Sequence, residues 1–200
     1  MNKEYYYEYE LGSSYCYPNS NVLINKLGIM ELSELNIAER EITAIKMVAI
    51  KNKPIKGKFE FEHLKRIHKY IFEDIFLWAG EARVVNISKG NQFCSYEKIE
   101  RYAGYIFEKL RNENYLKEIS VENLPKSFAY YFSEINVLHP FREGNGRTQR
   151  IFFELLADKI GCEIDFSNVS DGEMIEASAK GFDCDYSKLI EMFERITFPK

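Results

Sequence analysis

The chain carries the stretch HPFREGNGRTQR at residues 139–150, between two apolar segments with helical periodicity. Packing does not explain this composition, because a histidine, a carboxylate, an asparagine, two glycines and several arginines fall within twelve positions. Gly144 and Gly146 permit a tight turn whose backbone N–H groups converge just before a helix begins, where the helix dipole also favours an anion. The stretch therefore predicts a helix–loop–helix unit that cradles phosphate.

The charged side chains of this loop suit the same ligand. Arg147 and Arg150 are three residues apart, hence on one helical face, and their planar guanidinium groups neutralise phosphate. Glu143 offers a hard carboxylate for a Mg²⁺ ion that bridges phosphates. His139, whose ordinary pKa is about 6.5, suits proton abstraction near neutral pH. The alternative is an ordinary turn in which His139 only satisfies a local carbonyl, but the density of polar residues favours the catalytic interpretation.

Outside the loop, apolar residues recur at helical spacing along most of the chain. Pro140 ends the helix before the loop, and Gly161 lies where a cap glycine follows the next helix. Helices are expected at 34–51, 60–76 and 99–110, from Ser120 or Asn123 to 138, and at 147–160, 173–179 and 186–196. The apolar stripe of 34–51, which includes Ile37, Ile45 and Val48, is expected to face the core.

One segment departs from the helical period. Residues 83–87 indicate a short strand, Lys89-Gly90-Asn91 a turn, and residues 92–94 the returning strand. No second hairpin is expected. The sequence therefore predicts an all-α fold with one small β-hairpin.

Composition is that of an ordinary globular protein of 200 residues, 46% hydrophobic and 29% charged. Because no repeat or flexible linker divides it, we expect a single domain at 1–200, with an N-terminal arm at 1–33, a core around the loop at 139–150 and C-terminal helices at 169–196. The net charge of −4 argues against direct nucleic-acid binding. No segment has the pattern of a membrane helix or a signal peptide, which predicts a cytoplasmic protein and leaves secretion into a host cell open.

Histidines, cysteines and carboxylates outside the loop receive no role. The four cysteines are scattered without a Cys-x-x-Cys pair and are expected to be idle thiols. His63 is expected to be solvated, and His68 to be a satisfied core histidine. Other Asp and Glu residues are expected on solvated helix faces.

Residues His139 to Arg150 resemble, without departure, the signature of Fic-domain proteins, H-P-F-x-[D/E]-G-N-G-R-x-x-R. Segments at 17–29, at 68–80 with Trp78-Ala79-Gly80, and around Lys89-Gly90 look like family elements in the expected order. The resemblance thus covers residues 15–196. It implies a helical bundle with the hairpin as a flap over an active site.

The resemblance implies an enzyme that transfers AMP from Mg·ATP to a side-chain hydroxyl of a target protein. His139 would be the general base, and Glu143 would hold the Mg²⁺. Asn145 would contact the α-phosphate, while the two motif arginines would bind the β- and γ-phosphates. The implied ATP and phosphate ligands are Gly144, Asn145, Gly146, Arg147 and Arg150.

The hairpin has two interpretations under this resemblance. It is either a small edge ribbon or an exposed strand edge that aligns an extended segment of the target protein, and the second is favoured. Lys89 and Gly90 at its tip are also placed to touch the nucleotide.

Regulation is the last expectation that the resemblance carries. Many Fic proteins are silenced by a helix with the pattern [S/T]-x-x-x-E-[G/N]. Here the only Ser or Thr followed four residues later by Glu is Ser187 with Glu191, and Met192 departs from the pattern, so core packing is favoured over inhibition. The N-terminal arm resembles the class, often bacterial toxins, that a separate small antitoxin inhibits.

Two other functions stay open. One is a non-catalytic module that binds a nucleotide or an antitoxin, and the intact loop favours the enzyme over it. The other is a protein kinase like the related Doc proteins, whose loop replaces the glycines and binds ATP in reverse. Gly144 and Gly146 argue against the kinase.

Overall fold

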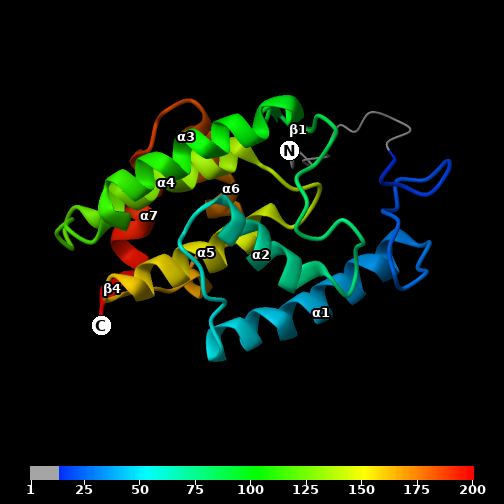
Figure 1. Ribbon diagram of the computed structural model, residues 1–200, viewed down its shortest axis with the longest axis horizontal. Helices are drawn as coiled ribbons and strands as arrows, with labels where there is room; N and C mark the ends of the chain where they lie inside the picture. Colours follow the sequence, from blue (N-terminus) through cyan, green and yellow to red (C-terminus); the bar gives the residue numbers. More distant parts are fainter. Residues whose placement is uncertain (1–13) are drawn as a thin grey trace.

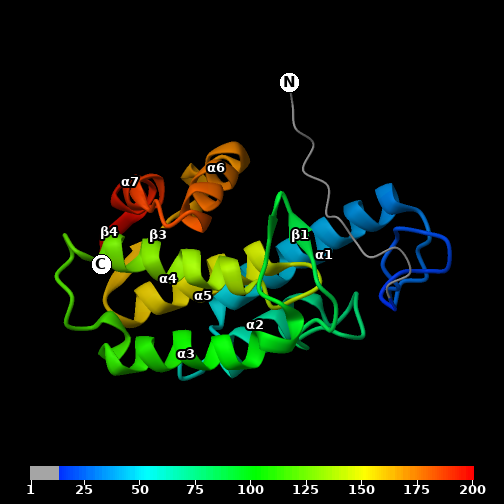
Figure 2. The same ribbon diagram turned by 90° about the horizontal axis from the view of Figure 1, so that it is seen from above.

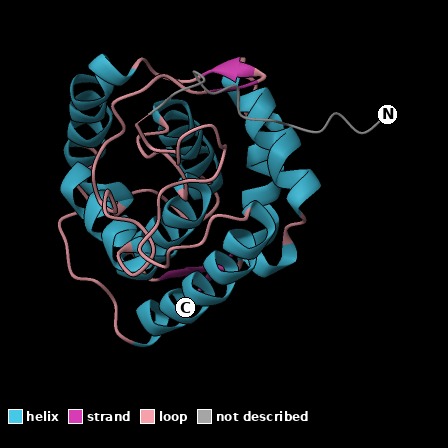
Figure 3. Cartoon of the chain, turned by 90° about the vertical axis from the view of Figure 1, so that its right-hand side faces the viewer, coloured by secondary structure: helices cyan, strands magenta, loops and turns pink. Residues whose placement is uncertain are grey.

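The computed structural model describes residues 14–200 and is mostly helical, as the sequence predicts (Figure 1, Figure 3). Residues 1–13 of the expected N-terminal arm lie outside the described residues, and the expected division of the chain stays a prediction. The α-helices within residues 14–200 are α1 (Leu32–Asn52), α2 (Phe61–Phe72), α3 (Ile99–Asn112), α4 (Leu124–Leu138), α5 (Asn145–Lys159), α6 (Asp171–Phe182) and α7 (Ser187–Ile196). Short 3-10 helices occur at Tyr96–Lys98, Asn114–Leu116 and Phe166–Asn168.

The two helices that flank the loop, α4 and α5, lie at the centre of the bundle (Figure 2). Helix α3 packs along α4, α2 packs on α5, and α1 packs against α2, while α6 and α7 cover another side of α4. Five buried phenylalanine rings form one cluster among these helices, and the centroids of contacting rings are 5.3 to 6.1 Å apart: Phe128, Phe132, Phe153, Phe166 and Phe193. Because both α4 and α5 contribute to this cluster, the core fixes both ends of the loop.

Helix α1 is only partly a core helix, and the expectation for its apolar stripe is wrong. Leu35 and Ile50 are buried, but Ile37, Ile45 and Val48 are 59%, 71% and 60% exposed. At roughly 100° of rotation per residue, the exposed three lie on the face opposite the buried two. The apolar residues of α1 therefore lie on two faces of the helix, and α2 packs against one of them.

The expected hairpin is present, but its strands are shorter. Strand β1 (Ser88–Lys89) pairs antiparallel with β2 (Asn91–Gln92), so Lys89 and Asn91 are paired residues and Gly90 alone forms the tip, with a φ of +77°. Glycine adopts such a left-handed conformation without strain. The expected strand at 83–87 is wrong, because the side chain of Arg83 turns into the protein and bonds to backbone carbonyls there.

A second small sheet was not predicted. Strand β3 (Cys162–Ile164) pairs antiparallel with β4 (Thr197–Pro199), and Glu163 lies opposite Phe198. Each strand has three residues, and α6 and α7 separate them in the sequence, so no turn signal marks the pair. Gly161, with a φ of +79°, ends α5 as predicted and directs the chain into β3.

Two further expectations concern thiols and membranes. All four cysteines are free thiols, of which Cys162 is buried and Cys184 exposed. Within residues 14–200, no helix is both long and apolar enough to span a bilayer.

Candidate functional site

The stretch at 139–150, called the motif loop from here on, reverses the chain between α4 and α5. His139 follows the last residue of α4 with a left-handed backbone (φ 42°, ψ 60°), and its N–H donates to the Ile135 carbonyl at 3.1 Å. Pro140 cannot continue the helix. Gly144, also left-handed with a φ of +80°, is the N-cap of α5. Two left-handed residues therefore set the direction of the loop.

The start of α5 has no side-chain cap. Its N-cap is a glycine, so the first backbone N–H groups of α5 lack the partner that a Ser, Thr or Asp would supply. A Cβ on Gly144 would lie 2.2 Å from Cζ of Phe72, so packing requires a glycine there as well. An uncapped helix N-terminus of this kind binds phosphate readily.

The side chain of Asn145 braces the motif loop. Its Nδ2 donates to the Phe141 carbonyl at 2.7 Å, and its Oδ1 accepts from the Phe141 N–H at 2.9 Å. Phe141 is 1% exposed and anchors the loop in the core. Asn145 thus holds the turn closed, and its contact with an α-phosphate stays a prediction.

His68 of α2 holds the loop from the opposite side. Its Nδ1 accepts from the Gly80 N–H at 2.8 Å, so Nε2 carries the proton and donates to the Glu143 carbonyl at 3.0 Å. Its ring stacks on Phe141 with centroids 3.8 Å apart. Burial lowers the pKa of His68 to about 3, so the imidazole stays neutral. The expectation of a satisfied core histidine is confirmed.

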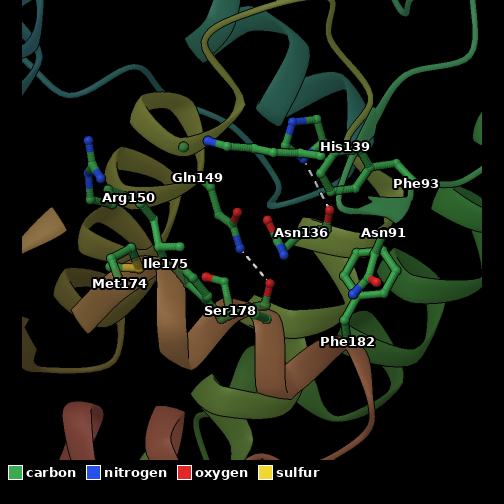
Figure 4. Close-up of a pocket in the computed structure, with 14 residues that line it drawn as sticks. Asn91, Phe93, Asn136, His139, Gln149, Arg150, Met174, Ile175, Ser178 and Phe182 are labelled. Carbon is green, nitrogen blue, oxygen red and sulfur yellow. Dashed lines mark hydrogen bonds between the residues drawn. The ribbon is translucent and has the colours of Figure 1, made fainter. Parts of the chain in front are cut away.

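The imidazole of His139 lies under the hairpin. It stacks on Phe93 with centroids 3.7 Å apart and 14° between the ring planes (Figure 4). Nδ1 is 3.2 Å from the Asn136 carbonyl, which can only accept, so Nδ1 carries the proton and Nε2 the lone pair. Burial, and then the charges of Arg83 and Lys89, lower the pKa of His139 to about 3, against the opposing effect of the Asn136 bond. The histidine is therefore a neutral base at physiological pH.

All three histidines of the chain are buried, which includes His63 and makes its expected solvation wrong. His63 packs against the ring of Phe59, 4.9 Å away, and burial lowers its pKa too. In the unfolded chain each histidine has a pKa near 6.5. Between that value and the lower folded pKa, only the unfolded state binds the protons, so acidification destabilises the fold.

We expect the free energy of unfolding to fall between pH 7 and 5.5, by roughly 1 kcal/mol each for His68 and His139. The measurement is urea unfolding at a series of pH values. His139→Asn removes one titrating group, so its stability should decline less steeply with acidification than that of the parent. Parallel curves for the variant and the parent would show that His139 keeps an ordinary pKa in the folded protein.

A pocket opens beside His139, between the motif loop, the hairpin and α6 (Figure 4). Of the predicted residues, His139, Gly146, Arg150 and Lys89 line it, whereas Gly90 at the hairpin tip does not. The lining residues from α6 are Met174, Ile175, Ser178, Ala179 and Phe182. The pocket thus joins a base, a helix N-terminus and cationic side chains to an apolar wall.

The two predicted arginines face different partners. Arg150 lines the pocket and, in the described part of the chain, has no ion pair with a carboxylate. Burial, followed by the charge of Arg147, lowers the pKa of Arg150. Arg147 instead donates to Glu39 of α1, to Thr43 Oγ1 at 3.2 Å and to Glu143 at 3.4 Å. Glu143 and Arg147 therefore lie on the α1 side of the loop, and neither lines the pocket.

Sequence reasoning missed the contacts by which three residues hold the site. Glu39, expected on a solvated face, has a side chain only 12% exposed, and burial raises its pKa although Arg147 lowers it. Arg83 donates to the His139 carbonyl at 2.9 Å, and His68 bonds the loop as described. Their partners are distant in sequence, so no local pattern reveals the contacts. The nearest sequence signal was the segment at 68–80, which begins at His68 and ends three residues before Arg83.

Comparison with known proteins places this geometry in a family. The sequence profile of the Fic/DOC family matches residues 58–157, half of the chain, including the whole motif loop. The chain belongs to the Fic/DOC family. It is 39% identical over 169 residues to "Protein adenylyltransferase VbhT" of Bartonella schoenbuchensis, covering 84% of this chain and 35% of VbhT. It is 37% identical to "Probable protein adenylyltransferase Fic" of Salmonella typhimurium, covering 90% of each chain.

Solved Fic domains share the fold over nearly the whole chain. BepC of Bartonella tribocorum, with bound AMPPNP, superposes with a TM-score of 0.88 at 26% identity, covering 96% of this chain and 100% of that one. The N-terminal Fic domain of a VirB-translocated Bep effector of Bartonella quintana, with bound ADP, reaches 0.91 at 30% identity, covering 95% and 97%. Adenine nucleotides therefore occupy Fic domains of this architecture.

Proposed function

We propose that the protein is a protein adenylyltransferase, which transfers AMP from ATP to a hydroxyl side chain of a target protein. One observation carries the proposal: His139 as a neutral base, the uncapped start of α5 at Gly146, and Arg150 all line one pocket. Relatives with this name match 84% and 90% of the chain, and nucleotides are bound in similar structures. The reaction class is nucleotidyl transfer.

The proposed chemistry assigns one step to each of these groups. Nε2 of His139 takes the proton of the target hydroxyl, and the hydroxyl oxygen forms a bond to the α-phosphorus of ATP. The bond from that phosphorus to the oxygen of the β-phosphate breaks, and pyrophosphate leaves. Such transfers depend mainly on positioning and on neutralisation of phosphate charge. The proposed phosphate ligands are Gly144, Asn145, Gly146, Arg147 and Arg150.

Glu143 fits the Mg²⁺ ion that accompanies a triphosphate. Its Oε1 accepts from the Gly144 N–H at 2.8 Å, its Oε2 has no hydrogen bond within residues 14–200, and its side chain is 25% exposed. Mg²⁺ commonly takes one carboxylate together with water and substrate phosphates. When bound, the ion would neutralise negative charge on the phosphates. A Mg²⁺ titration of the transfer rate in Glu143→Ala tests the assignment, which an unchanged curve would exclude.

The hairpin is proposed as the flap that contacts the target or the nucleotide. Lys89 lines the pocket, and Gly90 forms the turn beyond it, so one face of the hairpin is turned to the site of transfer. Within residues 14–200, β2 pairs with no strand other than β1, and we propose that a target segment adds alongside β2. In Lys89→Ala, a higher KM for the target alone would indicate target docking, and a higher KM for ATP alone would indicate a nucleotide contact.

A labelling experiment tests the proposed function. The protein is incubated with bacterial lysate and either α-labelled or γ-labelled ATP. We expect label from α-labelled ATP, but not from γ-labelled ATP, on a second protein. The reverse pattern would replace the proposal with a Doc-like kinase. Nucleotide binding without any transfer in lysates from several sources would favour the non-catalytic module.

Arg150→Ala is expected to raise the KM for ATP about 10- to 100-fold, because a charge-assisted bond to phosphate contributes roughly 1.5 to 3 kcal/mol. Its fold should persist, since Arg150 has no ion pair in the described part of the chain. Steady-state kinetics and thermal unfolding measure the two effects. Arg111→Ala, which changes an exposed arginine of α3, serves as the control. An unchanged KM in Arg150→Ala would remove Arg150 from the phosphate ligands.

Inhibition by a separate small antitoxin is proposed because no inhibitory carboxylate reaches Arg150 within residues 14–200. Glu191, the only internal candidate, is exposed on α7. The labelling reaction with the chain alone tests this, and Glu191→Gly should label no more target than the parent. A large gain of labelling in the variant would mean that inhibition is internal.

We further propose a cytoplasmic site of action, favoured by the need for ATP and by the four free thiols.

A further inference from the structure

Arg83 is a buried arginine between the Trp78-Ala79-Gly80 segment and the hairpin. Arg83 is only 2% exposed, and no carboxylate among the described residues contributes to its charge environment. Removing a guanidinium from water is unfavourable unless other groups accept its hydrogen bonds. The acceptors that Arg83 uses therefore indicate what the side chain does.

Three backbone carbonyls from separate segments accept these bonds. Nε donates to the carbonyl of His139 at 2.9 Å, Nη1 to that of Val85 at 2.6 Å, and Nη2 to that of Cys94 at 2.5 Å. Val85 precedes β1 and Cys94 follows β2, so the guanidinium bridges the two ends of the hairpin and joins both to the motif loop. The backbone N–H of Arg83 also donates to the Pro140 carbonyl at 2.8 Å.

These bonds hold the backbone beside both rings of the stack that Phe93 and His139 form. His139 is held at its own carbonyl, and Phe93 immediately precedes Cys94, whose carbonyl is held by the same guanidinium. The N–H of Cys94 donates to the Val137 carbonyl of α4 at 2.9 Å. The backbone beside each of the two stacked rings, whose centroids are 3.7 Å apart, is therefore bonded to one side chain.

The charge of Arg83 acts on the same imidazole. The groups that face His139 are the Asn136 carbonyl of α4, Lys89 of the hairpin, Arg83, and Arg150 of α5 across the pocket, while α6 adds no charged residue to the described pocket lining. Both Arg83 and Lys89 lower the pKa of His139, which favours the neutral base. Arg83 does not line the pocket, so it does not compete for the substrate.

We propose that Arg83 is a positioning residue that couples the hairpin to the catalytic base, by holding the carbonyls beside Phe93 and His139 in one guanidinium fork. This inference rests on the proposed function for the role of His139. Movement of the flap then displaces the base, so that target docking and proton abstraction are linked through Arg83.

Two substitutions separate geometry from charge. Arg83→Lys keeps a cation but cannot bridge three carbonyls, and Arg83→Gln removes the charge as well. In both we expect kcat to fall about 10- to 100-fold, the scale on which a small misplacement acts, with the Kd for ATP within about twofold. The acid limb of the pH–rate profile should move to higher pH in Arg83→Gln and stay near that of the parent in Arg83→Lys. Arg111→Gln, on the exposed face of α3, should change none of these.

Two readouts do not depend on activity: the NMR titration of the His139 ring, and amide hydrogen exchange of residues 88–93. We expect faster exchange in both Arg83 variants. Folded variants that keep the exchange rates and the His139 titration of the parent would overturn the coupling. Loss of ATP binding in parallel with loss of transfer would also overturn it, since that result indicates general damage. If the parent transfers no AMP to any target, the proposed function fails, and these two readouts still test the coupling.

Discussion

His139→Ala is expected to slow AMP transfer by roughly 10²- to 10⁴-fold, the usual contribution of a positioned general base. The Kd for ATP should change little, because the proposed phosphate ligands lie on the other side of the loop turn, at the start of α5. Transfer of label from α-labelled ATP measures the first effect, and nucleotide titration the second. The expected signature is an enzyme that binds its nucleotide and cannot deprotonate the hydroxyl.

The backbone at this position calls for a second variant. His139 has a φ of +42°, a conformation that alanine tolerates less well than asparagine. His139→Asn keeps a planar polar side chain and provides no base, so it should be as inactive as His139→Ala and more stable. Transfer at the parental rate by either folded variant would refute the assignment of the base. Weak transfer that rises with added imidazole would support it.

Gly144→Ala is expected to lower the free energy of unfolding by roughly 2–5 kcal/mol. A left-handed backbone costs an alanine about 1–2 kcal/mol, and overpacking of a core adds about 1–3 kcal/mol. Both apply here, because φ is +80° and the new Cβ would meet Cζ of Phe72 at 2.2 Å. Phe72 is completely buried and stacks on His68, so it has nowhere to move without disturbing the contact to the motif loop. Transfer should be lost together with stability.

Gly104→Ala is the matched control for this change. Gly104 lies within α3, and a Cβ there would meet nothing within 4 Å. An alanine in an exposed helical position should raise stability by about 0.5–1 kcal/mol. Urea unfolding of both variants measures the difference. If Gly144→Ala were as stable as Gly104→Ala, the description of Gly144 as a conformationally and sterically required residue would be wrong.

Features encoded by neighbouring residues were predicted from the sequence. Pro140 and Gly161 marked the ends of α4 and α5, and the glycines of the motif loop indicated a turn before a helix. The hairpin was found because its turn and its strands are contiguous, although its strands were overestimated. In each case a local conformational preference and the final structure agree.

Contacts between distant segments were not predicted. Glu39 and Arg147 meet only because α1 packs beside the motif loop, and a lone glutamate on an amphipathic helix gives no sign of a buried partner. The exposed face of α1 was likewise misjudged, since apolar periodicity does not tell which face finds a neighbour. β3 and β4 escaped detection because their pairing is set by the packing of α6 and α7 between them in the sequence.

The borders of the family match do not enclose the site that the match identifies. Residues 58–157 include the whole motif loop with His68 and Arg83, but they exclude Glu39 of α1 and the pocket wall from Met174 to Phe182 of α6. A gene fragment cut at those borders would encode every signature residue, yet leave Arg147 without its carboxylate and one side of the pocket missing. The smallest working unit is therefore defined by packing in three dimensions, and truncations intended for crystallisation or screening should keep α1 through α7.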